Sequence, residues 1–414
     1  SKLASRKAIK TASINDAISY TKKSIFSLEK LPLTDEVQKF IIDARTKLGV
    51  NLLELNYFHE AIEAIKPITE VALRANYEKR IPQIYTIVGA GRFCIEENFQ
   101  EAFDYLEEAL RVSKKTNDTG SLLYANYYMG YALSVNCEFE RAMHLFEQTY
   151  NLQAKINNLA WASVIKGTTS FMVYHFRGDI RMAYRLSREA VQMSKETNDI
   201  HSKLFTYSFH GISLYAKGLF NEAANFLNQG MELNEKIDQL WWNLAGNHYL
   251  GDIYFCLGEY QRAINHYVKV IRLLETKKVY HSWLNLSKIA LARGKAISNK
   301  EHIELESLYA LVSENKIKIL DGWVKRYIAE ILLSFDREHL SEAEEWIKQS
   351  IEVDNKRGMM FHLGQDYATY AEIFKRKGQK AKAKEKLYKA INILNECGAD
   401  GWVERYEKEL ALLS

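Results

Sequence analysis

The segment FNEAANFL at residues 220–227 is followed 40 residues later by YQRAINHY at 260–267. Both segments place an alanine after an aromatic residue and two polar residues, and both continue as an amphipathic helical pattern. Related segments are FHEAIEAI at 58–65, FQEAFDYL at 99–106, FERAMHLF at 139–146, IRMAYRLS at 180–187, LSEAEEWI at 340–347 and KAKAKEKL at 380–387. A motif that recurs at a constant period indicates a repeat array rather than two or three separate globular cores.

The alanine of this motif defines the period. It stands at Ala61, Ala102, Ala142, Ala183, Ala223, Ala263, Ala343 and Ala383, with gaps of 40 or 41 residues except for one gap of 80. The long gap contains a unit without the alanine, because Ile303 stands where the alanine is expected. Ala17, in NDAISYTK at 15–22, adds a unit at the start, so the spacing predicts ten units.

A second column of small residues lies twelve residues before these alanines, at Gly49, Ala90, Gly130, Gly211, Gly251 and Ala371. Small residues allow two helices to cross closely, whereas a large side chain there would cost about 1–3 kcal/mol by overpacking. Each unit is therefore predicted to be a pair of helices. Polar breaks such as KKTND at 114–118 and KETND at 195–199 separate successive units.

These columns resemble the small positions of the tetratricopeptide repeat, although the unit here has 40 residues rather than 34. The resemblance implies an all-α, right-handed superhelical solenoid of about ten helix pairs plus a C-terminal capping helix. We expect regular units over 1–276, a degenerate unit or joint over 277–320, two further units over 321–400 and the capping helix over 401–414. The unit length and ends such as LRVSKKTND also resemble the C-terminal helical arrays of bacterial STAND-type signalling proteins.

Composition and charge narrow the possible functions. The 56 basic and 52 acidic residues are nearly balanced, which disfavours nucleic acid or an anionic membrane as the main partner. The uncharged stretch 119–137 contains several polar residues and is predicted to be a buried helix rather than a membrane span. The four cysteines are far apart in the sequence, which is typical of reduced thiols in a cytoplasmic protein.

No motif for catalysis or cofactor binding is found. Gly294-Lys295 is followed by Ala296 and so fails as a phosphate-binding loop, and neither H-E-x-x-H nor G-x-S-x-G occurs. We therefore expect no enzyme activity, no cofactor and no metal. His175, His210 and His248 fall in successive first helices, where they could form a metal or titrating cluster or be hydrogen-bonded polar groups.

The tetratricopeptide resemblance places four positions of each first helix on the concave surface. On that basis the predicted partner-binding side chains are Tyr124, Tyr127, Tyr131, Met172, His175, Phe205, Tyr215, His248, Asp252 and Phe255. Such an aromatic, nearly uncharged wall supplies contact area typical of binding hot spots. Two interpretations remain open, because helical periodicity does not tell an open groove from one packed against neighbouring units.

The leading functional hypothesis is a protein- or peptide-binding scaffold that uses this concave face, as the regulatory or sensing C-terminal module of a larger signalling protein. An upstream domain of the same protein is one candidate partner, and no membrane partner is expected. The alternatives are a small-molecule-sensing regulatory domain and an RNA-binding helical repeat. The even charge balance disfavours the last of these.

Overall fold

The computed structural model describes residues 14–299, 303–335 and 337–413, and these ranges contain helices and no strand. The start of the predicted first unit, residues 1–13, lies outside them. The helices are α2 (Ile14–Leu28), α3 (Asp35–Glu54), α4 (Phe58–Arg74), α5 (Ile81–Cys94), α6 (Phe99–Lys115), α7 (Thr119–Val135), α8 (Phe139–Lys155), α9 (Leu159–Thr169), which continues as the π-helix η1 (Ser170–His175), α10 (Ile180–Lys195), α11 (Ile200–Lys217), α12 (Phe220–Ile237), α13 (Leu240–Cys256), α14 (Tyr260–Lys277), α15 (His281–Asn299), α16 (Leu305–Ser313), η2 (Lys318–Leu320), α17 (Asp321–Leu333), η3 (Arg337–His339), α18 (Leu340–Arg357), α19 (Met360–Arg376), α20 (Lys380–Cys397) and α21 (Asp400–Ala411).

The two columns of small residues lie where the helices of a pair cross, which confirms the predicted pairing. The motif alanines in the second helix of each pair, Ala61 to Ala383, are fully buried. A Cβ atom added to Gly130 would lie 2.8 Å from Phe146, and one added to Gly251 would lie 2.4 Å from Tyr267. Each of these contacts joins a first helix to the second helix of the same pair.

The polar breaks end one pair and start the next. In KKTND, Asn117 takes a left-handed conformation with φ of 53°, which stops α6. The following residue, Asp118, caps α7 by accepting a hydrogen bond from the Ser121 N–H at 3.2 Å. Asp199 caps α11 in the same way after KETND. The break sequences therefore set where the first helix of each pair begins.

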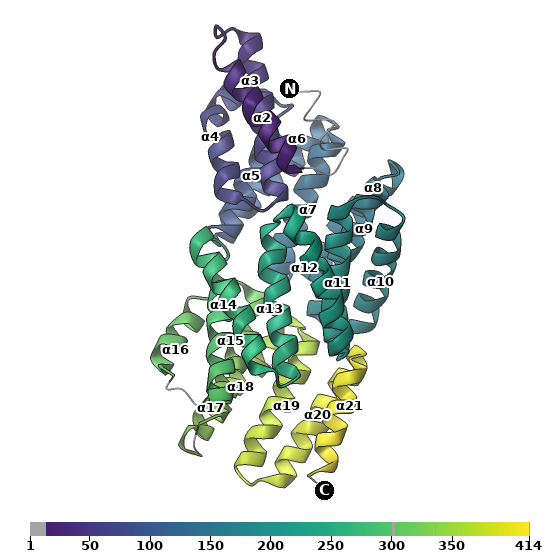
Figure 1. Cartoon of the computed structure of the whole chain (residues 1–414), viewed down its shortest axis with the longest axis vertical. Helices are drawn as coiled ribbons and strands as arrows, with labels where there is room; N and C mark the ends of the chain where they lie inside the picture. Colours follow the sequence, from purple (N-terminus) through teal and green to yellow (C-terminus); the bar gives the residue numbers. More distant parts are fainter. Residues whose placement is uncertain (1–13, 300–302, 336, 414) are drawn as a thin grey trace.

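The odd-numbered helices are the first members of the pairs and pack on one another, while the even-numbered helices lie outside them. The array coils so tightly that its second turn sits on its first. The two turns touch at five joints. At each joint the end of one inner helix meets the start of the inner helix five pairs later. The joints connect α3 with α13, α5 with α15, α7 with η2 and α17, η1 with α19, and α11 with α21. Figure 1 shows the last of these near the bottom, where α21 lies below α11.

Backbone hydrogen bonds define two of these joints. The Leu240 N–H donates to the Leu55 carbonyl at 3.0 Å, and the Tyr280 N–H donates to the Cys94 carbonyl at 2.8 Å. Contacts between residues about 180 positions apart are absent from a simple solenoid, in which each unit touches only its neighbours. The fold is therefore a two-turn, tetratricopeptide-like superhelix of packed helix pairs, closed on itself.

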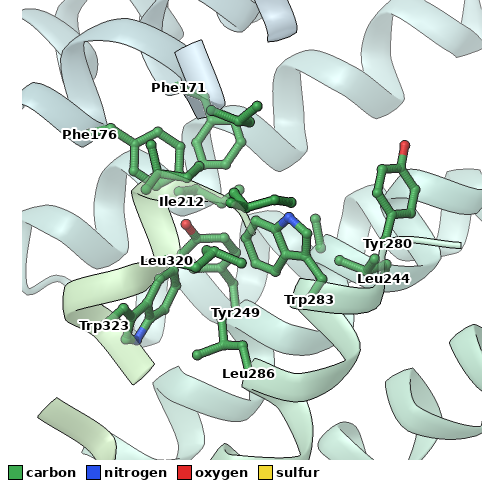
Figure 2. Close-up of a cluster of buried hydrophobic side chains, with 14 of the residues drawn as sticks. Phe171, Phe176, Ile212, Leu244, Tyr249, Tyr280, Trp283, Leu286, Leu320 and Trp323 are labelled. Carbon is green, nitrogen blue, oxygen red and sulfur yellow. The ribbon is translucent and has the colours of Figure 1, made fainter. Parts of the chain in front are cut away.

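A core of aromatic side chains fills the centre where the two turns meet (Figure 2). Phe171 comes from the first turn, and its ring centroid lies 6.0 Å from that of Tyr249 in the second turn. Tyr249 in turn lies 5.9 Å from Trp323, and Trp283 lies 6.1 Å from the same indole. These rings come from η1, α13, α15 and α17 and close the axis of the superhelix. We call them, with the residues packed on them, the central core.

Candidate functional site

Half of the side chains predicted to line the concave face lie in this central core. They are Tyr131, Met172, His175, His248 and Asp252, and none is more than 8% exposed. The second turn covers them: Trp241 packs on Tyr131 with ring centroids 5.6 Å apart, and Tyr249 lies 6.0 Å from His175. The self-packed interpretation of the aromatic wall therefore describes these five positions.

The polar members of this group make some of their hydrogen bonds within the core, while Tyr131 Oη, His175 Nδ1, His248 Nε2 and Asp252 Oδ2 have no hydrogen-bond partner among the described residues. Asp252 accepts hydrogen bonds from the hydroxyls of Tyr267 at 2.6 Å and Tyr327 at 2.8 Å. The Nδ1 atom of His248 lies 3.1 Å from a serine hydroxyl, within hydrogen-bond distance. The Nδ1 atom of His210 lies 3.0 Å from another serine hydroxyl. Burial lowers the pKa of His175 to about 3 and of His210 to about 4, so both are neutral at pH 7.

The three histidines of the sequence pattern do not meet one another. His175 lies against Phe361 and His362, His248 lies against Trp283 and Trp323, and His210 lies against Tyr184 and Phe226 on another side of α11. Within the described ranges, no group of His, Cys, Asp and Glu side chains has the geometry to hold a metal ion. The interpretation of these histidines as hydrogen-bonded polar groups fits this arrangement.

The other five predicted side chains line two pockets at opposite ends of the central core, and two of them, Phe205 and Tyr215, are only 5% and 6% exposed. Tyr124, Tyr127 and Phe205 line the first, which we call the aromatic pocket. Tyr215 and Phe255 line the second, which we call the arginine pocket. The structure thus divides the single predicted groove into two separate hollows.

The aromatic pocket has a volume of about 200 Å³ and opens where α7, α9 and α11 begin, beside the joint of α3 with α13. Trp161 forms one wall and meets the Tyr124 ring edge-on at 6.3 Å. Burial raises the pKa of Tyr127 to about 12, so its hydroxyl stays protonated. Ile156, 57% exposed, marks the rim. The pocket is thus an apolar, aromatic cavity large enough for one side chain.

One carboxylate lies at the edge of this pocket. The Tyr124 hydroxyl donates a hydrogen bond to Glu54. Burial and, next, the nearby Asp199 raise the pKa of Glu54 to about 7, while Lys47 acts in the opposite direction. Burial also lowers the pKa of His201, which keeps that ring neutral. Among the described residues, no lysine or arginine lines this pocket or the hollow that adjoins it.

The floor of the aromatic pocket belongs to the joint of α3 with α13. The Gln239 side-chain amide donates to the Asn56 side-chain carbonyl. Gln239 also caps α13, because its Oε1 accepts from the Trp242 N–H at 2.9 Å. Its backbone is fixed by Asn234, which donates to the Gln239 carbonyl at 3.1 Å. The floor is therefore held by several hydrogen bonds, and it links the shape of the pocket to the stacking of the two turns.

The arginine pocket is larger, about 400 Å³, and lies where α11, α13 and α15 end, beside the joint of α11 with α21. Arg293 lies between two rings, with its guanidinium carbon 3.4 Å from the Phe255 centroid and 3.9 Å from the Tyr327 centroid. Arg326 lines the same hollow and donates to Asp366 at 3.0 Å. This pocket is therefore polar and contains buried cations.

The predicted site residues did not include Trp161, His201, Glu54, Arg293 or Arg326. His201 stands four residues, or one helical turn, before the predicted Phe205, and Trp161 occupies the same place in the preceding unit. The longer helices of a 40-residue unit supply that additional turn, so unit length was a usable signal for these two residues. Arg293 lies in the first helix of the unit without the motif alanine, ten residues before Ile303, where the repeat register is weakest.

Comparisons with known proteins concern the fold. No family model and no curated protein matches the sequence. Among solved structures, a STAND protein with a tetratricopeptide repeat sensor from Pyrococcus horikoshii is similar at 16% identity over 91% of this chain, with a TM-score of 0.43. The chain spans only 57% of that protein.

Two further solved structures are similar over most of their length. A Rap protein complexed with Competence and Sporulation Factor shares 13% identity, covers 99% of this chain and 97% of its own, and has a TM-score of 0.47. Human IFIT1 with m7Gppp-AAAA shares 11% identity, with coverage of 94% and 88% and a TM-score of 0.47. None of the described helices is long and apolar enough to cross a membrane. The helix pairs described above make the chain an all-α, tetratricopeptide-like helical-repeat protein, and the likeness to these structures is one of fold alone.

Proposed function

We propose that the chain is a non-enzymatic protein- or peptide-binding scaffold whose partner inserts a cationic side chain into the aromatic pocket. One observation carries this proposal: aromatic rings and the Glu54 carboxylate line a cavity that no lysine or arginine of the described residues enters. A cation over an aromatic face is stabilised by about 0.5–2 kcal/mol, depending on desolvation. A lysine or arginine side chain would make this contact and also place a positive charge next to Glu54.

The size of the cavity sets how the partner would bind. About 200 Å³ holds one side chain and not a folded segment. The rest of the partner would lie across the rim, where the exposed Ile156 offers an apolar contact. Such an arrangement, with one anchor in a pocket and weaker contacts around it, is typical of protein interfaces.

The role of a regulatory module follows from this proposal. A scaffold that recognises a short basic segment could bind an upstream domain of a longer protein or a separate signalling partner. Proteins that bind single-stranded RNA combine aromatic side chains, on which the bases stack, with basic side chains that contact the backbone. The aromatic pocket presents a carboxylate instead, so RNA is a poorer fit than a basic peptide.

The test is selection of peptides from a random displayed library on the wild-type chain, with counter-selection on Trp161→Leu. Enriched peptides should contain lysine or arginine. In fluorescence anisotropy their affinity should fall at least about tenfold in Trp161→Leu, and also when the key lysine is acetylated. Trp346→Leu, a change on α18 outside the pocket, is the matched control and should bind normally.

Two outcomes would redirect the proposal. Enriched peptides that bind Trp161→Leu as tightly as wild type would place the interface elsewhere. Competition by a free organic amine, at the same concentration as by the peptide, would favour the small-molecule sensor over the peptide scaffold.

A further inference from the structure

The arginine pocket contains a buried cation whose hydrogen-bonding capacity is largely unused. Arg293 is 5% exposed, and its Nε lies 2.8 Å from Glu330 Oε2 in an ion pair that is not aligned as a hydrogen bond. Its Nη1 also has no hydrogen-bond partner among the described residues. A guanidinium carries five N–H donors, and buried donors are normally paired. This side chain is therefore held by stacking and one ion pair while its donors remain available.

Arg326, in the same pocket, shows the contrast. Its Nη1 donates to Asp366 at 3.0 Å and to the His362 carbonyl at 3.3 Å. Arg326 is therefore a structural cation that ties α17 to α19. Arg293 makes no comparable hydrogen bonds, although it is as deeply buried and is fixed between Phe255 and Tyr327. A rigid guanidinium of this kind is suited to bidentate recognition of an oxyanion.

We propose that the arginine pocket is a second binding site, for a small molecule that carries a carboxylate or phosphate group. Arg293 anchors the oxyanion, and Arg405, at the exposed mouth of the pocket on α21, adds a second positive charge. The site stands on its own observations and does not depend on what the aromatic pocket binds.

The acids of the pocket do not oppose this assignment. Glu330 is already engaged, because it pairs with Arg293 and its Oε1 accepts from the Thr369 hydroxyl at 3.3 Å. Glu409 lies 3.8 Å from Arg405 in an ion pair, and burial raises the pKa of Glu409 above its ordinary value. The volume of about 400 Å³ leaves room for a small organic body next to the oxyanion. These acids and the tyrosine hydroxyls would then contact hydroxyl or amino groups of the ligand.

The experiment uses phosphate and citrate separately as probes, each compared with sodium chloride at equal ionic strength. One readout is the melting temperature, which should rise by about 2 °C or more when the probe concentration is about ten times its Kd. The other is alkylation of Cys256, which lines the pocket, followed by mass spectrometry. A bound anion should slow that reaction by about tenfold at the same saturation. The probe that acts at lower concentration tells whether a phosphate or a carboxylate is the preferred group.

Variants assign the effect to Arg293. Arg293→Met should abolish both responses, and Arg293→Lys should retain part of them. Arg262→Met is the matched control, because Arg262 also stacks on a tyrosine, 3.8 Å from the Tyr254 centroid, but lies outside the pocket. If Arg293→Met does not fold, Arg405→Ala serves instead and should weaken both responses. The proposal is overturned if neither probe affects wild type, or if the response survives in the folded Arg293 and Arg405 variants.

Discussion

The two pockets occupy equivalent places in the superhelix and differ in chemistry. The aromatic pocket adjoins the joint of α3 with α13, and the arginine pocket adjoins the joint of α11 with α21. In both, the central core closes the inner end and the ends of inner helices form the walls. One pocket carries a carboxylate among aromatic rings, and the other carries buried arginines. Stacking of the two turns therefore creates the hollows, while individual side chains decide what each could bind.

The largest expected effect comes from breaking the joint beside the arginine pocket. Trp402 is 4% exposed, packs on Phe220 at 5.1 Å and donates from its indole N–H to the Tyr215 carbonyl at 3.0 Å. Trp402→Ala should lower the free energy of unfolding by about 3–5 kcal/mol, because it leaves a large cavity. Urea denaturation followed by circular dichroism measures this loss.

The control for this change is Tyr388→Ala. Tyr388 is 55% exposed on α20, so its removal should change stability by less than about 0.5 kcal/mol. Equal losses in the two variants would show that α21 is not held by its joint with α11.

A smaller effect is expected at the joint beside the aromatic pocket. Gln239→Ala removes the hydrogen bond to Asn56 and the cap of α13, which should lower the free energy of unfolding by about 1–3 kcal/mol. The same denaturation experiment measures it. A loss as large as that of Trp402→Ala would mean that the two joints contribute equally to stability. That result would contradict the expectation that the joint with more buried apolar contact contributes more.

The smallest effect concerns Glu54 and depends on pH. Its folded pKa of about 7 exceeds the ordinary value of 4.5, so between these values the folded state binds more protons than the unfolded state. Wild-type stability therefore falls as the pH rises through this window. Glu54→Gln removes that slope and should be more stable than wild type by about 1–2 kcal/mol near pH 8, with little difference near pH 5.

Thermal unfolding of both proteins across this range checks the prediction. If the difference in stability between the two proteins is the same at every pH, the pKa of Glu54 is not raised by folding. In wild type, a cationic peptide should also bind more tightly above pH 7, where Glu54 is ionised, and this gain should be absent in Glu54→Gln.

Much of the fold could be predicted from the sequence because close helix crossings need small residues at fixed spacing. The alanine column and Gly130, Gly211 and Gly251 reported these crossings directly. The number of units per turn could not be predicted in this way. It depends on small rotations between neighbouring pairs, which add up over five units and leave no local pattern.

The candidate sites were only partly predictable for the same reason. Tyr124, Tyr127 and Phe205 line the aromatic pocket as residues of the predicted concave face. Tyr131 and His175 belong to the same face but become core once the second turn stacks on them. Arg293 could not be predicted as a candidate, because its stacking between two rings and its unpaired donors depend on contacts that only the three-dimensional structure shows.

The spacing of the joints limits how a chain of this kind can grow by gene duplication. In an open solenoid an added unit disturbs only its two neighbours. Here a unit inserted between α12 and α13 would fall within all five joint intervals, so Leu240 would no longer meet Leu55 and every other joint would lose its partner as well. A unit added beyond α21 would leave these joints intact. Closure of the superhelix therefore makes the number of units in the first turn a fixed property of the fold, while length remains variable at its far end.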